Sequence, residues 1–116
     1  MLEGIYDNNY YSNIMCKHNG IVYRSTWERD FHIVNSHLLY EHTVIQYTLI
    51  DGSHHTYLTD FTDIINNIIY EIKPDVFMLK DKNIMKKNIA IQWCHDHDYT
   101  YKHIGDKVIY DIKKSL

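Results

Sequence analysis

The sequence predicts an α+β domain in which a mixed sheet is flanked by helices. Apolar residues recur at helical spacing in two segments, residues 26–40 and 80–94. Short apolar runs separated by turn residues occupy the chain between and after these segments. The resulting order of helix, three strands, helix and strand is typical of a mixed sheet covered by helices.

Size and composition favour one folded unit. The chain has 116 residues, of which 45% are hydrophobic and 14% aromatic. Disordered chains are poor in such residues, and 116 residues leave no room for a second core. Residues 1–20 have no clear apolar period, so we expect an N-terminal arm there and a single domain over residues 21–116.

The first helix is predicted over residues 26–40. Ser25 and Glu28 have the spacing of a capping box, with Ser at the N-cap and Glu at the third helical position. Four apolar residues then follow at helical spacing, namely Trp27, Phe31, Val34 and Leu38.

Three strands are predicted next, over residues 44–50, 54–62 and 68–73. Asp51-Gly52 forms a typical hairpin turn between the first two strands. Asn66-Asn67 provides turn residues between the second and the third. The three strands should therefore form an antiparallel meander within the sheet.

After the third strand, Pro74 ends the pairing because it has no backbone N–H to donate. A second helix is predicted over residues 80–94, with apolar side chains along one face. A strand over residues 99–104 and a short final segment over residues 107–112 close the chain.

Polar side chains interrupt two of the predicted strands. Because strand side chains alternate, Glu71 and Lys73 must share one face. A two-residue turn at Asn66-Asn67 would place Asp60 opposite Lys73, and a four-residue loop would place it opposite Glu71. Both registers bring the three residues to one face, whereas a three-residue loop would separate them.

Two carboxylates and a lysine on one face suit the hydrolysis of a phosphodiester. Carboxylate oxygens are the ligands that Mg²⁺ prefers, and Mn²⁺ should substitute for it. Lys73 would orient the attacking water or stabilise developing negative charge, and the carbonyl of Ile72 would add a metal ligand. The alternative is a surface ion pair between Glu71 and Lys73, with Asp60 as a polar residue near a turn. The residues alone leave the two interpretations balanced.

A family resemblance favours the first interpretation. The segments Asp60-Phe61 and 69–74 (Ile-Tyr-Glu-Ile-Lys-Pro) resemble the restriction-endonuclease-like core of PD-(D/E)XK nucleases. Residues 22–28 are similar to the opening helix of one branch, which contains TnsA-like transposon-end endonucleases, phage head-completion nucleases and phage junction-resolving endonucleases. Residues 90–101 also resemble the helix and strand that follow the motif in the phage members. Thr59 departs from the pattern, because it stands where the superfamily name has Pro.

The resemblance implies a divalent-metal-dependent endonuclease that hydrolyses DNA, of phage or mobile-element type, acting on junctions or DNA ends. It also implies that Glu28 joins Asp60 and Glu71 around the metal. Taken alone, Glu28 would instead close the capping box of its helix. A virus-encoded protein of the host cytoplasm fits this resemblance, and a transposase or a capsid component is the implied partner.

Contacts to phosphates are expected from Arg24, Lys86 and Lys87, although lysines on a helix more often form a solvated face. The formal net charge of -3 argues against binding through bulk positive charge, but not against a local site. The histidine-rich segments 54–55 and 94–97 lack the paired spacing of structural zinc sites.

A chain this small offers little surface to a duplex, so we expect a homodimer in which each subunit cuts one strand. No apolar run approaches the ~18 residues of a membrane span, and two cysteines are too few for a disulfide framework. An intracellular location without membrane contact follows as the expectation. The alternative function is a non-catalytic nucleic-acid-binding or phage assembly subunit that retains the nuclease fold.

Overall fold

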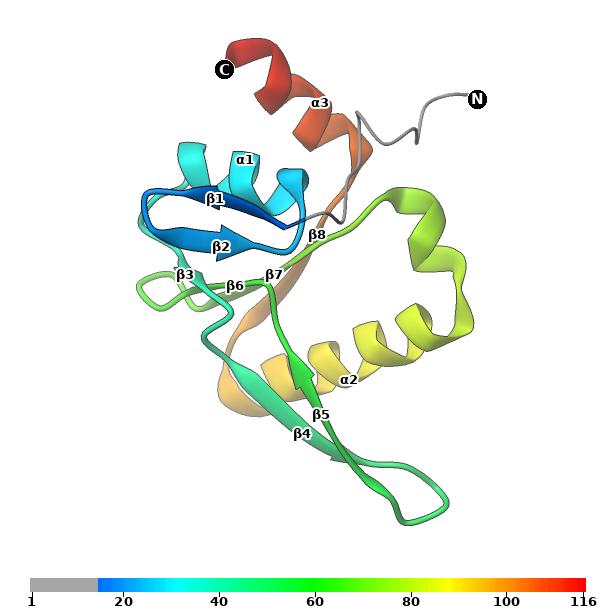
Figure 1. Cartoon of the computed structure of the whole chain (residues 1–116). Helices are drawn as coiled ribbons and strands as arrows, with labels where there is room; N and C mark the ends of the chain where they lie inside the picture. Colours follow the sequence, from blue (N-terminus) through cyan, green and yellow to red (C-terminus); the bar gives the residue numbers. More distant parts are fainter. Residues whose placement is uncertain (1–14) are drawn as a thin grey trace.

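The computed structural model describes residues 15–116 (Figure 1). Its elements in chain order are β1 (Cys16–His18), β2 (Ile21–Tyr23), α1 (Thr26–Val34), β3 (Leu39–Tyr40), β4 (Val44–Thr48), β5 (His54–Leu58), β6 (Phe61–Asp63), β7 (Ile68–Ile72), the 3-10 helix η1 (Asp75–Leu79), α2 (Asp81–His97), β8 (Thr100–Ile104) and α3 (Asp106–Ser115).

The centre of the fold is a four-stranded mixed sheet in the order β3-β6-β7-β8. β8 runs parallel to β7, and the other pairs are antiparallel. β1–β2 and β4–β5 each form a separate two-stranded ribbon. Helices α1 and α3 lie beside each other on one side of the sheet, and α2 packs along β8 on the other (Figure 1). The predicted α+β class, with a mixed sheet flanked by helices, is confirmed.

Two clusters of buried side chains hold these layers together. Trp27, Phe61 and Ile109 are fully buried where α1 and α3 meet the sheet. Ile45 and Ala90 belong to a second cluster, between the β4–β5 ribbon and α2. The ribbon thus packs on α2, and it also contacts the central sheet through Tyr101 of β8 and through the Tyr57 hydroxyl, which donates to Glu71 of β7.

The first helix is shorter than predicted, because it ends at Val34 instead of residue 40. Asn35 caps it, since its side-chain amide donates to the carbonyl of Phe31 at 3.0 Å. Leu39–Tyr40 then pairs with β6 as a strand. Leu38 is buried, as its spacing suggested, but it lies in the turn between α1 and β3 and not in the helix.

The strand predicted over residues 54–62 is divided between two sheets. His54–Leu58 pairs with β4, and Phe61–Asp63 pairs with β7. The change of partner occurs at Thr59, whose backbone N–H and hydroxyl both donate to the carbonyl of Thr43, at 3.1 and 2.9 Å. The predicted meander is therefore divided at Thr59 between the β4–β5 ribbon and the central sheet.

The remaining boundaries differ mainly at the ends of the chain. Most of the expected arm lies outside the described residues, but Cys16–His18 forms a strand against β2. The second helix extends to His97, where Asp98 adopts a left-handed conformation (φ 59°). The predicted final segment is helix α3. Across residues 15–116, no helix combines the length and the apolar character that crossing a membrane would need.

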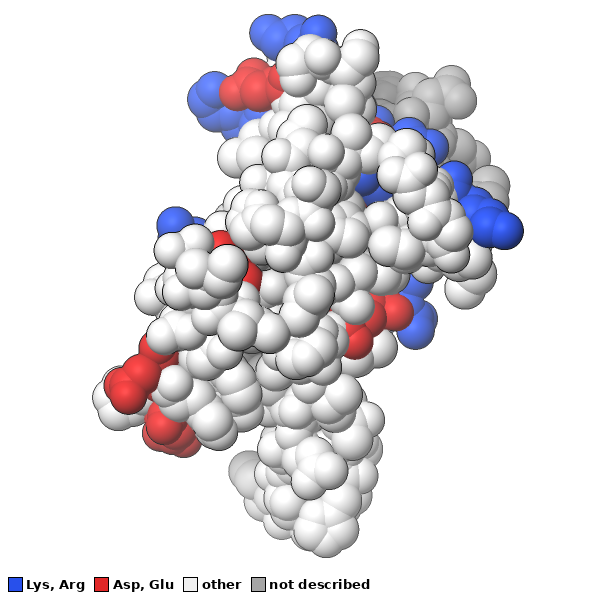
Figure 2. Space-filling view, turned by 90° about the vertical axis from the view of Figure 1, so that its left-hand side faces the viewer, with Lys and Arg blue, Asp and Glu red and all other residues white. Residues whose placement is uncertain are grey.

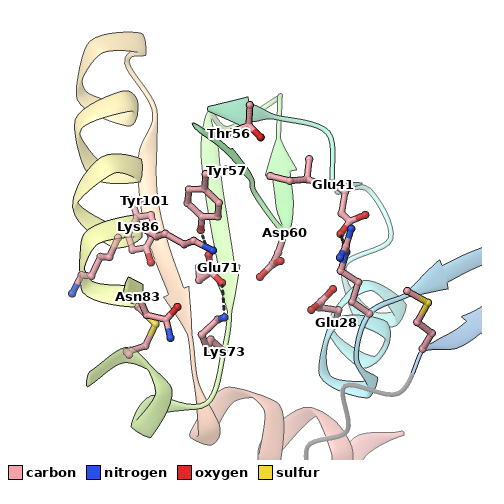
Figure 3. Close-up of a pocket in the computed structure, with 15 residues that line it drawn as sticks. Glu28, Glu41, Thr56, Tyr57, Asp60, Glu71, Lys73, Asn83, Lys86 and Tyr101 are labelled. Carbon is pink, nitrogen blue, oxygen red and sulfur yellow. Dashed lines mark hydrogen bonds and ion pairs between the residues drawn. The ribbon is translucent and has the colours of Figure 1, made fainter. Parts of the chain in front are cut away.

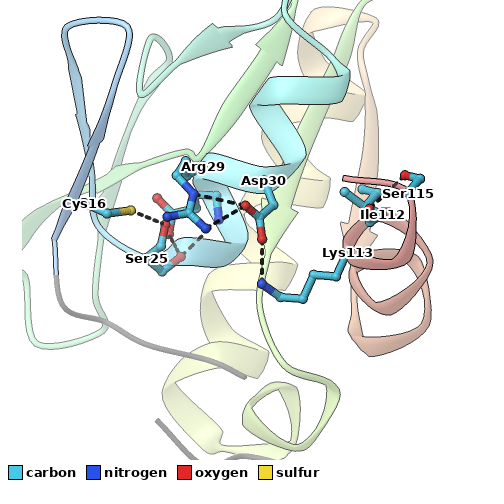
Figure 4. Close-up of polar contacts among 8 residues, drawn as sticks. Cys16, Ser25, Arg29, Asp30, Ile112, Lys113 and Ser115 are labelled. Atoms are coloured by element: carbon cyan, nitrogen blue, oxygen red, sulfur yellow. Dashed lines mark hydrogen bonds and ion pairs between the residues drawn. The ribbon is translucent and has the colours of Figure 1, made fainter. Parts of the chain in front are cut away.

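A buried carboxylate ties α1 to α3 (Figure 4). Asp30 is 1% exposed and accepts hydrogen bonds from Arg29, at 2.9 Å, and from Lys113, at 2.6 Å. A buried carboxylate that loses a cationic partner keeps its desolvation cost without compensation. This contact should therefore stabilise the helix pair.

Replacing Lys113 with Met should lower the free energy of unfolding by about 2 kcal/mol, because the Asp30 carboxylate loses one charged donor. Lys107→Met is the matched control, since Lys107 pairs with Asp111 on an exposed helix surface. Urea denaturation measures both variants. Equal losses in the two variants would contradict the proposed role of the contact.

Candidate active site

The site depends on the turn between β6 and β7. Asp63 pairs with Ile68, so the turn has four residues, 64–67. The Asp63 carboxylate accepts from the backbone N–H of Asn66 at 3.0 Å, and Asn67 adopts a left-handed conformation (φ 56°). The sequence allowed a two-residue or a four-residue turn, and the structure has the four-residue one. Extended beyond Phe61 and Tyr70, this register places Asp60 opposite Glu71.

Asp60 lies just before β6 and is held by the backbone of β7. Its Oδ2 accepts from the N–H of Ile72 at 2.7 Å. In a strand, the N–H and C=O of one residue point toward the same neighbour. The carbonyl of Ile72 therefore lies on the edge that faces Asp60, while its side chain is buried in the core.

Glu71 is 8% exposed, and both of its carboxylate oxygens have neighbours. The Tyr57 hydroxyl donates to Oε1, and Lys73 Nζ lies 4.0 Å from Oε2. Burial raises the pKa of Glu71 to about 7, while the nearby Lys73 ammonium opposes the shift and the Glu28 carboxylate adds to it. Part of the Glu71 population is therefore protonated near neutral pH.

Glu28 makes the N-cap contact through its backbone, while its carboxylate is bound by two hydroxyls. Its backbone N–H donates to Ser25 Oγ at 3.2 Å, which is the N-cap contact. Its carboxylate does not complete a backbone capping box, because it accepts from the Ser25 hydroxyl at 3.1 Å and from the Tyr40 hydroxyl at 2.6 Å. Burial raises the pKa of Glu28 above its usual range.

The predicted catalytic residues Glu28, Asp60, Glu71 and Lys73 line one cavity of about 470 Å³. In Figure 3, the carboxylates of Glu28 and Asp60 point into the same space, with Glu71 and Lys73 facing it from β7 and its end. Burial, together with the charge of Glu28, raises the pKa of Asp60 well above its usual range. The three carboxylates therefore repel one another when all are ionised.

The chemistry of the donor set fits a hard divalent cation, because carboxylate and backbone carbonyl oxygens are the usual ligands of Mg²⁺. Asp60 Oδ1 accepts no hydrogen bond from residues 15–116. Within the same residues, however, no group of three or more His, Cys, Asp or Glu side chains is arranged to hold a metal ion. Each carboxylate instead accepts from protein donors, which belong to Ser25, Tyr40, Tyr57 and Ile72.

The three cations predicted to contact phosphates also border the cavity. Lys86 and Lys87 reach it from α2, and Lys86 Nζ lies 5.7 Å from the centroid of the Tyr57 ring. Arg24 is 61% exposed, but its Nε lies 2.5 Å from Glu41, so its charge is already compensated. The α2 lysines are thus better placed than Arg24 to meet an anion.

Several cavity residues had no signal in the sequence. Glu41 stands in a left-handed conformation, and its N–H donates to the carbonyl of Asp60 at 2.8 Å. Tyr57 and Tyr40 hold the carboxylates, but eleven tyrosines gave no means of selecting them. The buried hydroxyl of Tyr101, a third cavity residue, finds no hydrogen-bond partner in residues 15–116. An unpaired buried hydroxyl is costly, so the Tyr101 hydroxyl lowers the stability of the fold.

Comparisons of the chain with protein family models, curated proteins and solved structures found no match. The resemblance to PD-(D/E)XK nucleases therefore stays a prediction that rests on the order of the motif residues. The geometry of the cavity is an independent observation beside it.

Neutralising Glu71 should stabilise the metal-free protein at high pH. Its pKa is about 7 in the folded protein against 4.5 ordinarily, so the folded state binds more protons than the unfolded state between these values. The cost of ionising Glu71 is absent below pH 4.5, grows up to pH 7 and is complete above it. Glu71→Gln should therefore raise the free energy of unfolding by up to about 3 kcal/mol at pH 8, and by little at pH 4.

Urea denaturation at the two pH values, with EDTA present, measures this difference. Asp51→Asn is the control, because hydrogen bonds from Ser53 lower the pKa of the exposed Asp51 and give the opposite sign. If the free energy of unfolding of Glu71→Gln has the same pH dependence as that of the wild type, the raised pKa of Glu71 is contradicted.

Proposed function

We propose that this protein is a divalent-metal-dependent endonuclease that hydrolyses DNA phosphodiester bonds. The observation that supports it best is the convergence of Glu28, Asp60, Glu71 and Lys73 on one cavity, from three separate parts of the chain. A surface ion pair would not require the burial of Glu28 and Glu71 beside Asp60, which is unfavourable unless a cation or another partner compensates it.

Asp60, Glu71 and the carbonyl of Ile72 would hold Mg²⁺ or Mn²⁺, and Glu28 would complete the set. When bound, the ion lowers the pKa of its water and neutralises charge at the scissile phosphate. The same positive charge would offset the burial and the mutual repulsion that raise the pKa values of Asp60 and Glu71.

The chain's own groups have separate tasks in this proposal. Lys73 is partly exposed beside Glu71, where its ammonium can orient the attacking water and stabilise negative charge that develops on the phosphate. The Tyr57 hydroxyl and the Ile72 N–H fix the directions of Glu71 and Asp60. These contacts pre-organise the site before the substrate arrives.

Lys86 and Lys87 would bind phosphates that flank the cleaved bond, as cations at the cavity border. Arg24 would contribute only if its pair with Glu41 opens. Local contacts of this kind suit a protein whose formal net charge is -3.

Incubation with plasmid and branched DNA in Mg²⁺, Mn²⁺ or EDTA tests the activity. Cutting should require a metal and should fall by at least about 100-fold in Asp60→Ala, because the cavity loses one of its proposed metal ligands. Asp111→Ala is the matched control, since Asp111 is exposed on α3. Cutting by Asp60→Ala at the wild-type rate would overturn the proposal.

A second candidate function is a non-catalytic nucleic-acid-binding or assembly subunit. It is favoured by the lack of a formed three-ligand metal group in residues 15–116. Binding of DNA without cutting in any of the metals would support this candidate over the nuclease.

Replacing Tyr101 with Phe separates stability from activity. The free protein should melt at the same or a higher temperature, because the variant lacks the unpaired buried hydroxyl. Cleavage should fall, because the hydroxyl lies close enough to Glu71 and Asp60 to interact with their charges. A lower melting temperature together with unchanged cleavage would assign Tyr101 a structural role.

A further inference from the structure

The β4–β5 ribbon projects from the body of the molecule (Figure 1). One side of it packs on α2 through Ile45 and Tyr57. The other side, which we call the outer face, carries three cross-strand pairs of exposed residues: Val44 with Leu58, Gln46 with Thr56, and Thr48 with His54. No described element covers this face, and each strand of the ribbon has an open edge.

The outer face carries no Asp, Glu, Lys or Arg. Between Thr43 and Thr59, Asp51 in the loop is the single residue of these four types. Figure 2 shows the projecting lower end of the molecule without a red or blue side chain on the visible side. Exposed ribbons usually carry charges, lysine above all, that prevent pairing with other chains. Their absence indicates that a partner covers this face when the protein acts.

The outer face is continuous with the candidate active site. Thr56 and Leu58, at the base of the ribbon, line the cavity that contains Asp60 and Glu71. A polymer held in this cavity would therefore pass along the ribbon. The cavity border carries Lys86 and Lys87, whereas the ribbon offers neutral hydrogen-bonding groups.

This division of charge matches duplex recognition, in which cations contact phosphates and neutral polar side chains contact base edges. Gln46 is the residue type that pairs with adenine, and Thr48 can donate or accept. Ile50, in the loop, is fully exposed and could contact a thymine methyl group, the apolar feature of the major groove. We propose that the outer face enters the major groove of duplex DNA beside the cleaved phosphate, an inference that rests on the proposed nuclease function.

The dimensions of the ribbon favour DNA over duplex RNA. Five paired positions at about 3.3 Å per residue span roughly 13 Å, and the two strands lie about 5 Å apart. The major groove of B-DNA is about 12 Å wide and 8.5 Å deep, and it admits a two-stranded ribbon. The major groove of A-form RNA is too narrow for side chains to read.

The test compares the double variant Gln46→Ala/Thr48→Ala with Asn88→Ala/Gln92→Ala, a matched pair of exposed polar residues on α2. Both are made in an Asp60→Asn background that prevents cleavage. Fluorescence anisotropy gives the Kd for a labelled DNA duplex, for the RNA duplex of the same sequence and for the single strand. The ribbon variant should raise the Kd for the DNA duplex by about tenfold, as expected for one lost base contact, with smaller changes for the other two ligands.

An unchanged Kd for the DNA duplex, or an equal loss for all three ligands, would overturn the inference. A change from dimer to monomer in sedimentation, with DNA affinity retained, would also overturn it and assign the outer face to a second copy of the chain. Ile50→Asn, at a fully exposed position, is a second variant that should weaken duplex binding if the first one unfolds.

The two proposals fail separately. Wild-type protein that binds the DNA duplex through the ribbon but cuts no substrate would overturn the nuclease proposal alone. Wild-type protein that cuts DNA, with a ribbon variant of unchanged affinity, would overturn the groove inference alone.

Discussion

The pairing of Asp63 with Ile68 across a four-residue turn sets the positions of the candidate catalytic groups. One residue more or less in this turn would move Asp60 to the opposite face from Glu71, because strand side chains alternate. The hydrogen bond from the Ile72 N–H then holds Asp60 where the chain leaves the β4–β5 ribbon for the sheet. The parallel pairing with β8 places β7 inside the sheet and buries Glu71. The register of the sheet thus determines which side chains face the cavity.

Tyrosine hydroxyls donate hydrogen bonds to two of the buried carboxylates. Tyr57 donates to Glu71, and Tyr40 donates to Glu28. A neutral donor satisfies a buried carboxylate only in part, so the pKa values of both carboxyls remain raised. Helix α1, which carries Glu28, is in turn fixed to α3 by the contact between Asp30 and Lys113. The cavity wall therefore depends on packing well away from it.

Local pattern predicted the parts of the site that depend on periodicity. Alternation placed Glu71 and Lys73 on one face, and spacing identified Ser25 as a helix cap. Periodicity failed where contacts between distant residues determine the ends of the elements. Leu38 lies in a turn and is still buried, and Thr59 divides a strand through its contacts with Thr43. Cavity tyrosines were not predictable, since their roles come from neighbours far away in the sequence. The choice between two turn lengths also needed the structure.

The crowding of Glu28, Asp60 and Glu71 in one cavity has an evolutionary consequence. Each ionised carboxylate there makes the metal-free fold less stable. Selection for thermal stability alone would therefore favour substitutions that remove one of these charges. A library screened for heat resistance alone would accumulate changes at these three positions. If Glu28, Asp60 and Glu71 are retained in distantly related natural sequences, selection must act on them for a function other than folding.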